Sequence, residues 1–299
     1  MKTLLKLSLV LGLAILGAYA ADSQIWDGPE ISNILGYGKE GSKGLGPLFT
    51  MLQHEYFVKI FLAILVLVPA AFLTHYKIIG PKVFPHDGKK IQAFSLYNRI
   101  VHQVAAVSFI VIVPTGFVIV FGDFFGGGMF VRACKHLHGI FTIPFAIVVI
   151  PMFLMWLKEA IFNFDDVKWM MIVGGYLSKE KKPIPAGKFN AGQKMWYWIA
   201  TLGGMVMVLS GAAMFFLDFN IDMVKSMTGL SQIDFLRVMA ILHNVVGFLV
   251  VALFITHVYM SMFAIKGAVH SILDGHMEEE EVRILHSSWY KKLKGEGKV

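Results

Sequence analysis

The chain has 299 residues, of which 56% are hydrophobic and only 16% charged; soluble domains carry about 25% charged residues, so this composition is typical of a membrane protein. The net charge of +7 does not indicate a nucleic-acid partner, because the basic residues lie between apolar runs, as on the charged face of a membrane protein. The single cysteine, Cys134, excludes an intrachain disulfide, a thiolate-held iron–sulfur cluster and a cysteine-type zinc site within this chain.

Residues 1–20 have the pattern of a secretory signal peptide. Lys2 and Lys6 form a basic start, a short apolar stretch follows, and Ala18–Ala20 (Ala-Tyr-Ala) is a small-x-small cleavage site. An uncleaved anchor helix is the alternative interpretation. After cleavage, residues 21–55 are expected to form a polar, glycine-rich periplasmic segment.

Five apolar segments follow, each long enough to cross about 30 Å of hydrocarbon at about 1.5 Å per helical residue. Their length favours helices, because a strand of a membrane barrel needs only about 9–11 residues. The predicted spans are residues 57–74, 100–121, 137–157, 195–217 and 236–265. The sequence therefore predicts an all-α, multi-pass membrane protein.

The orientation follows from the distribution of lysine and arginine. Most basic residues near the helices lie in the loop after the first predicted helix, in the loop after the third, and in the C-terminal tail. Loops rich in these residues stay in the cytoplasm. We therefore expect a bacterial inner-membrane protein with a cytoplasmic C-terminus, and a cleaved signal peptide predicts the same orientation.

Four histidines lie in the predicted membrane helices, where an ionisable residue is costly and marks a functional candidate. They are His102, His138, His243 and His257. The last two share one helix and are 14 residues apart. At about 100° per residue, both rings leave the same helix face, about 21 Å apart along the axis.

The predicted topology sorts these histidines by depth. Helix 2 begins in the cytoplasm, which places His102 near the inner surface, and helix 3 begins outside, which places His138 near the outer surface. The last helix runs inward, so His243 lies outside and His257 inside. The expected pairs are therefore His138 with His243, and His102 with His257.

Two facing neutral imidazoles in a helix bundle are what a six-coordinate, electron-transferring haem needs. The sequence therefore predicts two b-type haems, an outer and an inner one, with these histidines as axial ligands. Arg99 and Lys135, beside His102 and His138, are candidate partners of the haem propionates. A transporter or proton channel that uses the same histidines as a relay is the alternative from a different functional class.

The remaining histidines lie at helix ends or in loops and are expected to be solvated, except His136, which points away from His138 because two residues turn a helix by about 200°. The solvated set is His54, His75, His86, His270, His276 and His286. The acidic run Glu278–Glu281 is likewise expected to be a solvated turn.

The entry to the fourth predicted membrane helix carries a second candidate site. Asn190 is a good N-cap and Gln193 occupies the matching capping-box position. A helix cap alone explains both residues. Alternatively, Asn190 and the backbone of Gly192 lie at the level of the inner haem, near His257, and hydrogen-bond a quinone carbonyl.

These residues resemble the gamma subunit of respiratory formate dehydrogenase, the cytochrome b subunit of that enzyme, over roughly residues 95–295. The stretch 187–194 (GKFNAGQK) is similar to the signature of that family. The other matching stretches are Arg99-x-x-His102, Leu137-His138-Gly139, Leu242-His243 and residues 257–267, which run from His257 to Lys266-Gly267.

The resemblance implies a four-helix dihaem cytochrome b domain at residues 95–270, followed by a cytoplasmic tail at 271–299. The signal peptide, the 21–55 segment and the extra transmembrane helix at 56–76 depart from the shortest members of that family, and the haem core does not need them. The resemblance also implies a catalytic alpha subunit with molybdenum or tungsten that oxidises formate, and an iron–sulfur beta subunit. The gamma subunit is then the electron-transfer part of this oxidoreductase, passing electrons through two b haems to menaquinone in anaerobic respiration. Carried over to this sequence, Asn190, Gly192 and His257 would border the quinone.

Other membrane cytochromes resemble this layout. The cytochrome b subunit of a membrane-bound nickel–iron hydrogenase has a similar helix count and histidine arrangement, and the membrane anchors of thiosulfate or polysulfide reductases are further alternatives. The motif around Asn190 favours the formate enzyme.

Overall fold

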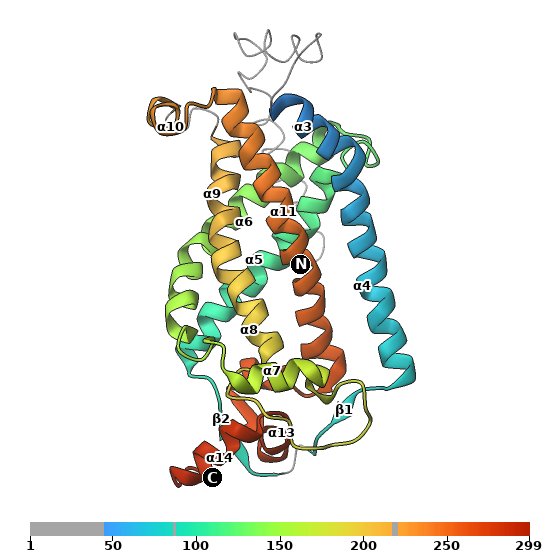
Figure 1. The fold of residues 1–299 in the computed structure, drawn as a ribbon, viewed down its shortest axis with the longest axis vertical. Helices are drawn as coiled ribbons and strands as arrows, with labels where there is room; N and C mark the ends of the chain where they lie inside the picture. The colour runs from blue at the N-terminus through green and yellow to red at the C-terminus, as the bar shows by residue number, and fades with distance from the viewer. Residues whose placement is uncertain (1–44, 86–87, 217–220) are drawn as a thin grey trace, which may run out of the picture. The chain divides into compact units, whose positions relative to one another are not determined.

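The computed structural model describes residues 45–85, 88–216 and 221–299 (Figure 1). The signal peptide predicted at residues 1–20, the greater part of the predicted periplasmic segment 21–55, and His86 lie outside these residues. Five helices of the described chain are long and apolar enough to cross a membrane: Leu45–Ile78, Leu96–Val120, Gly128–Trp156, Ala191–Phe215 and Gln232–Ala264. The predicted all-α, multi-pass fold is therefore confirmed.

Each span is longer than its apolar run alone indicates. The first consists of α3 (Leu45–Met51), a π-helical turn (Leu52–Phe57) and α4 (Val58–Ile78), so helix begins within the segment expected to be a polar lead-in. The second and third are α5 (Leu96–Val120) and α6 (Gly128–Trp156). The fourth is α8 (Ala191–Trp198), a π-helical turn (Ile199–Gly203) and α9 (Gly204–Phe215), and the fifth is α11 (Gln232–Tyr259) with a π-helical turn (Met260–Ala264).

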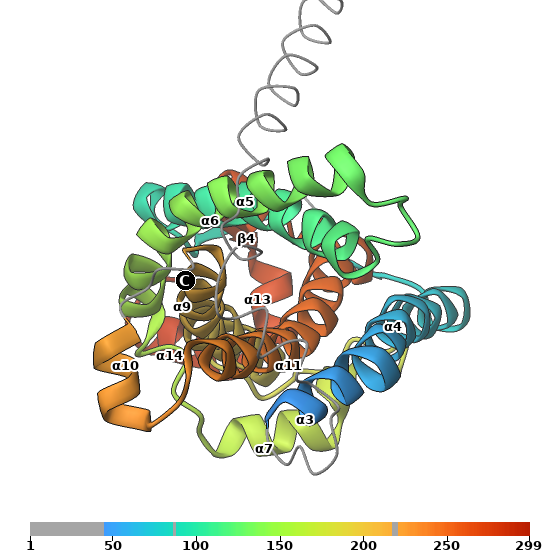
Figure 2. The same cartoon turned by 90° about the horizontal axis from the view of Figure 1, so that it is seen from above.

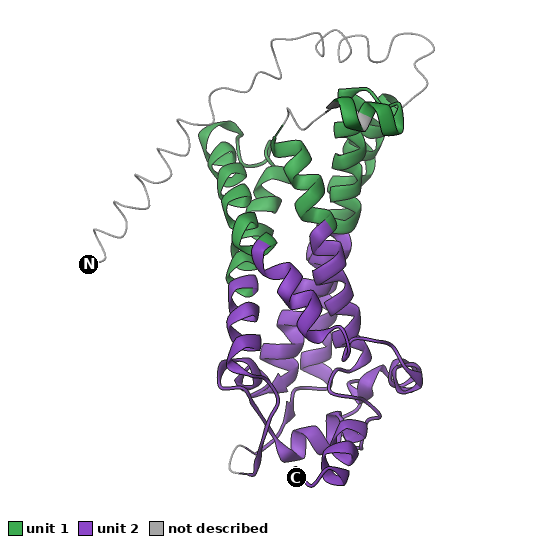
Figure 3. Ribbon diagram, turned by 90° about the vertical axis from the view of Figure 1, so that its left-hand side faces the viewer, with its two compact units in different colours: residues 1–61, 106–146, 206–247 green, residues 62–105, 147–205, 248–299 purple. Residues whose placement is uncertain are grey.

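The chain divides into two compact units (Figure 3). Unit 1 contains the described residues up to Phe61, Ala106–Ala146 and Val206–Gly247. Within it, α5 lies beside α6, and α9 lies beside α11 (Figures 1 and 2). The Phe109 and Phe145 rings join the first two helices edge to face, with centroids 5.0 Å apart. Unit 1 also holds the short helix α10 (Ile221–Thr228).

Unit 2 contains Leu62–Ala105, Ile147–Met205 and Phe248–Val299, and it adds short elements to the membrane helices. Two small sheets join distant segments: β1 (Lys82–Val83) pairs in parallel with β3 (Ile265–Lys266), and β2 (Lys90–Gln92) pairs antiparallel with β4 (His276–Glu278). The short helices are α7 (Phe164–Met171), α12 (His270–Leu273), α13 (Glu279–Leu285) and α14 (Ser287–Gly295), with a 3₁₀ turn at Val173–Gly175.

The C-terminal tail is folded into unit 2, which corrects two expectations. Glu278 and Glu281 of the acidic run are buried, and so is His286, which has 3% of its surface exposed. His286 Nδ1 donates to the Gly187 carbonyl at 2.8 Å. Burial, with the Glu278 carboxylate as a second cause, raises the pKa of Glu281 to about 7. Burial lowers the pKa of His286 to about 4, with the carbonyl partly opposing.

Part of the tail is buried because its charged residues alternate with apolar ones on short amphipathic helices. Val282, Ile284 and Leu285 of α13 enter cores that also contain Phe84, Trp169 and Ile184, or Ile91 and Met277. The backbone of the tail pairs with the segment before α8, since Ile184 N donates to the Ile284 carbonyl at 2.7 Å and Trp289 N to the Ala186 carbonyl at 3.1 Å. The tail thereby holds the chain that leads into Asn190.

Candidate functional site

The structure brings together, within each unit, the histidines that the topology pairs by depth. In unit 1, the rings of His138 on α6 and His243 on α11 have centroids 6.3 Å apart and an interplanar angle of 58°. In unit 2, the rings of His102 on α5 and His257 on α11 have centroids 6.2 Å apart and an interplanar angle of 58°. Each unit thus contains one pair with nearly the same geometry.

This spacing fits a six-coordinate haem. A bond between a metal and an imidazole nitrogen is about 2.0–2.1 Å long, as in zinc sites, and the ring centroid lies about 1.1 Å behind the nitrogen, so two opposed ligands place their centroids about 6.3 Å apart. The donor set is also suitable, because two neutral imidazoles without carboxylates suit an electron-transfer haem. Among the described residues, no group of three or more histidine, cysteine or acidic side chains is placed to hold a metal ion instead.

Polar atoms of α5 lie beside Nδ1 of His138, the ring nitrogen that would not bind iron. Its Nδ1 lies 2.9 Å from the Ile112 carbonyl oxygen and 3.2 Å from Thr115 Oγ1, both on α5. A histidine whose Nδ1 donates to a carbonyl keeps the lone pair of Nε2 for a metal. Gly116 lies directly under the ring, and a Cβ there would come within 3.3 Å of His138 Cε1.

His243 has the same kind of surroundings, supplied by α9. Its Nδ1 lies 3.0 Å from Ser210 Oγ, and the Met207 backbone is a further hydrogen-bond partner. A Cβ at Gly211 would come within 3.3 Å of His243 Cε1. The glycines are among the small residues by which a helix bundle is expected to accommodate a porphyrin, but the sequence analysis missed Thr115 and Ser210. A hydroxyl residue directly before a glycine in two membrane helices was the available signal.

The pair in unit 2 is surrounded by aromatic rings. Trp196 stacks on His257 with centroids 5.4 Å apart and planes 20° apart, and Trp156 lies 6.4 Å from the His102 ring. His102 Nδ1 is buried and has no hydrogen-bond partner within the described part of the chain. The two pairs therefore differ at Nδ1: His138 and His243 have hydrogen-bond partners at this atom, whereas His102 has none among the described residues.

Asn190 is the N-cap of α8, as the sequence predicts. Its Oδ1 accepts from the Gln193 N–H at 3.0 Å, and Gln193 Oε1 accepts from the Asn190 N–H at 2.9 Å, which completes a capping box. Asn190 is buried. Gly192 lies against Trp169 of α7, and a Cβ there would come within 3.1 Å of that ring, so only glycine fits this approach without a shift.

A buried ion pair that the sequence analysis missed holds α7 to α8. Lys194 Nζ lies 2.7 Å from Asp166 Oδ2, and each side chain has only 2% of its surface exposed. Lys194 also donates to the Ile161 carbonyl at 3.0 Å, and Asp166 accepts from the Asn163 N–H at 2.7 Å. Both charges are therefore satisfied, as burial requires.

The two candidate propionate partners differ in the structure. Arg99 donates through Nε to the Ile272 carbonyl at 3.3 Å and through a terminal nitrogen to the Leu273 carbonyl, both in α12. Lys135 is exposed on α6. Arg99 thus anchors the start of the tail, whatever else it binds.

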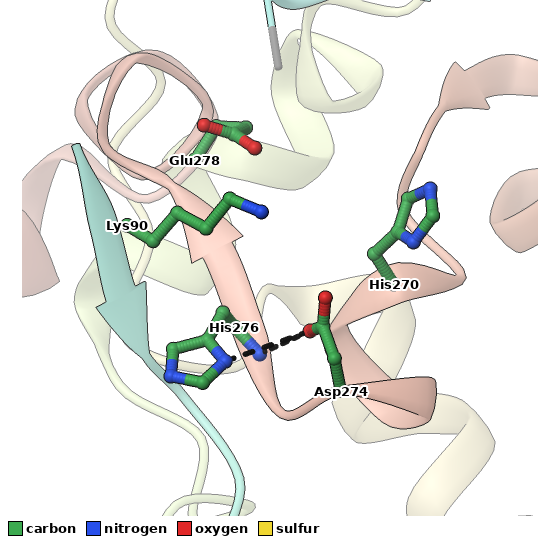
Figure 4. A pocket seen from close by; sticks show the side chains of 5 residues that line it. All are labelled: Lys90, His270, Asp274, His276 and Glu278. Carbon is green, nitrogen blue, oxygen red and sulfur yellow. Dashed lines mark hydrogen bonds and ion pairs between the residues drawn. The ribbon is translucent and has the colours of Figure 1, made fainter. Parts of the chain in front are cut away.

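A small polar pocket lies elsewhere in unit 2 (Figure 4). Lys90 of β2, His276 and Glu278 of β4, and His270 and Asp274 of α12 line it. Asp274 Oδ1 accepts from the His276 N–H at 2.8 Å and lies 3.6 Å from His276 Nδ1.

Apolar spanning helices that place histidines in pairs define a multi-pass membrane cytochrome of the b type. The comparison with protein families agrees: the model of the prokaryotic cytochrome b561 family matches residues 93–275, and the chain belongs to this family. Membership implies a b-type haem, and the matched range includes all four paired histidines.

Curated relatives are similar at low identity. The nitrate-inducible formate dehydrogenase cytochrome b556 subunit of Escherichia coli is 23% identical over 163 residues, which cover 53% of this chain and 70% of the relative. The formate dehydrogenase cytochrome b556 subunit of Haemophilus influenzae is 25% identical over 201 residues, covering 65% and 79%. A second Escherichia coli formate dehydrogenase cytochrome b556 subunit is 22% identical over 210 residues, covering 68% and 93%.

Proposed function

We propose that this chain is the cytochrome b subunit of a formate dehydrogenase complex, and that it transfers electrons through two b haems to menaquinone in anaerobic respiration. The observation that carries the proposal is the pair of histidines in each unit, at a spacing that suits two axial bonds to one iron. The names of the curated relatives support the choice of formate dehydrogenase. The motif around Asn190 supports it independently.

In this proposal His138 and His243 hold one haem, and His102 and His257 hold the other. Each haem, when bound, takes up and releases one electron at its iron without an open position for oxygen chemistry. The histidines would hold the haems, and the apolar helices would exclude water from them. Because His243 and His257 are 14 residues apart on α11, the same helix supplies a ligand to each site.

The quinone site is proposed beside the second pair. Asn190 and the Gly192 backbone, at the start of α8, lie in the same unit as His257. An amide carries two N–H donors in addition to the oxygen that caps the helix, so Asn190 can cap α8 and still donate to a quinone carbonyl. Lys194 and Asp166 position this helix start through their buried ion pair.

The direction of transfer follows from the predicted orientation. With the C-terminus in the cytoplasm of a bacterial inner membrane, the His138 and His243 pair lies toward the periplasm. The haem held by this pair would receive electrons from a periplasmic iron–sulfur beta subunit. The electrons would come from a molybdenum or tungsten alpha subunit that oxidises formate. Reduction of menaquinone at the cytoplasmic side would then consume cytoplasmic protons and build a proton-motive force.

Purification of the native complex through a tag on this chain tests the proposal. We expect formate-dependent reduction of a quinone analogue, and two haem b per chain by pyridine haemochrome. A preparation that contains a hydrogen-oxidising subunit and reduces quinone with hydrogen would instead show the cytochrome b subunit of a nickel–iron hydrogenase. A chain without b-type absorbance would overturn the haem sites themselves.

A further inference from the structure

We propose that Thr115 with Gly116 and Ser210 with Gly211 form two equivalent cradles that hold His138 and His243 by Nδ1 and lower the reduction potential of the haem bound by that pair. They act as positioning residues through the histidines. This inference rests on the proposed haem ligation in unit 1. None of these four residues is a proposed ligand.

The two cradles are built alike on two different helices. In each, a hydroxyl residue directly precedes a glycine, and the backbone group paired with the imidazole belongs to the residue four positions before that glycine: Ile112 before Gly116, and Met207 before Gly211. Because the glycine has no side chain, the imidazole edge can reach this backbone, at 3.3 Å from where a Cβ would stand in both cases.

The hydroxyl groups determine which imidazole nitrogen carries the proton. Thr115 Oγ1 has two carbonyl acceptors for its single hydrogen, Val111 at 2.7 Å and Ile112 at 3.0 Å. Ser210 Oγ likewise has the carbonyls of Val206 at 2.7 Å and Met207 at 3.3 Å. With the hydrogen used, each oxygen can only accept from the nearby Nδ1. Both imidazoles therefore carry their proton on Nδ1, and Nε2 keeps its lone pair.

A hydrogen bond from Nδ1–H makes an imidazole a more basic ligand. A more basic ligand stabilises ferric iron relative to ferrous iron and so lowers the potential at which the haem accepts an electron. The other pair lacks this feature on one side, because His102 Nδ1 has no partner among the described residues. The cradles would therefore give a haem held by His138 and His243 a lower potential than a haem held by His102 and His257, which would favour electron transfer from the first to the second.

Redox titration of the purified full-length chain, followed in the visible α-band, tests the cradles. The variants are Thr115→Val, Ser210→Ala and the double variant, with Thr115→Ser as the conservative variant. Thr142→Val is the matched control, because Thr142 Oγ1 donates at 2.7 Å to the backbone carbonyl of His138 and not to its ring. Gly116→Ala adds a Cβ at the ring edge.

We expect the potential of one haem to rise in Thr115→Val and Ser210→Ala, to rise further in the double variant, and to stay unchanged in Thr115→Ser and Thr142→Val. The second haem should titrate as in the unaltered chain. Loss of one haem from Thr115→Val, with retention in Thr115→Ser, supports the same hold on His138. Both haems bound with neither potential moved would overturn the cradles, as would an equal shift in Thr142→Val. Absence of haem from the unaltered chain would overturn the proposed function and the cradles with it.

Discussion

The two histidine pairs have the same geometry and different surroundings. Their centroid separations differ by 0.1 Å and their interplanar angles are both 58°. In unit 1 the rings are held through Nδ1 by carbonyl and hydroxyl groups, whereas in unit 2 the neighbours are the rings of Trp156 and Trp196. Helix positions thus suffice to set the spacing of a pair, and the neighbouring side chains then set the chemical character of each imidazole.

The two units also differ in the polarity of their buried side chains. Unit 2 contains buried charges and the folded tail, including the pair of Lys194 with Asp166 and the neutral His286. Among the described residues of unit 1, the buried polar side chains are hydroxyl groups, such as Thr115 and Ser210. In the proposed function, unit 1 would hold its haem among neutral hydroxyl groups, and unit 2 would combine a haem with the proposed quinone site.

Removal of one histidine at a time tests whether the two pairs hold separate haems. Alanine at His138 or His243 should abolish binding of one haem, and alanine at His102 or His257 should abolish binding of the other, because one imidazole cannot hold a six-coordinate site. Pyridine haemochrome and redox titration would show one haem of unchanged potential in each variant.

The matched control for these ligand variants is His136→Ala. His136 also lies on α6 but packs edge to face on Phe215, so both haems should remain. If His102→Ala and His138→Ala lost the same haem, the assignment of one pair to each unit would be wrong.

The next largest effect is expected in unit 2, at the buried ion pair. Lys194→Ala leaves Asp166 as an uncompensated buried charge, which typically costs about 3–5 kcal/mol of stability. Thermal unfolding of the purified chain should show the loss, together with a perturbed spectrum of only the haem bound by His102 and His257.

An exposed ion pair on α7 provides the control. Lys168 lies 3.5 Å from Asp165 and is half exposed, so Lys168→Ala should cost less than about 1 kcal/mol. Equal losses in the two lysine variants would show that Lys194 contributes no more than a surface charge.

The sequence predicts the spans well, because they depend on local patterns, and the histidines that the topology pairs lie together in each unit. Apolar runs of membrane length identify the helices, and the interval between His243 and His257 places both rings on one face. The ends of the helices were predicted less accurately, because residues outside the apolar runs continue the helix. Gln232 begins α11 in this way, and Ala-Gly-Gln begins α8.

The features that the sequence analysis missed involve partners far apart in the chain. Asp166 and Lys194 each have a sufficient local explanation, as the third residue of a capped helix and as a loop cation, so neither one signals the other. Thr115 and Ser210 bond their own helix carbonyls, as hydroxyl residues in membrane helices often do, which hides their contact with histidine. The many charged residues of the tail indicated a solvated segment, so its short amphipathic helices were not predicted.

The folded tail makes unit 2 sensitive to acid. His286 has a pKa of about 4 in the folded chain, below its usual value of 6.5, so folding requires the neutral ring. Its contribution is complete above about pH 6.5 and is lost as the pH falls toward 4, by up to roughly 3 kcal/mol for a fully buried group. Thermal unfolding between pH 4 and pH 8 should show this loss, and His286→Asn should remove it.

Glu281 changes the stability with pH in the direction opposite to His286, so its contribution has to be removed by mutation. Its pKa is raised to about 7, so its carboxyl group favours folding while protonated and this contribution is lost as the pH rises through 7. The acid effect of His286 should therefore be larger in a Glu281→Gln background. If His286→Asn left the pH profile of that background unchanged, His286 would not be responsible for the acid sensitivity.

The smallest expected effect separates the two roles of Asn190. Asn190→Ala should slow quinone reduction about tenfold, which corresponds to the loss of one hydrogen bond of about 1.4 kcal/mol in the transition state, with both haems still bound. Gln193→Ala breaks the other half of the same capping box without removing the Asn190 amide. Stopped-flow oxidation of the reduced haems by a menaquinone analogue compares the two variants. If Asn190 contacts the quinone, Asn190→Ala should be slower than Gln193→Ala. Equal slowing in the two variants would assign the whole effect to the helix cap.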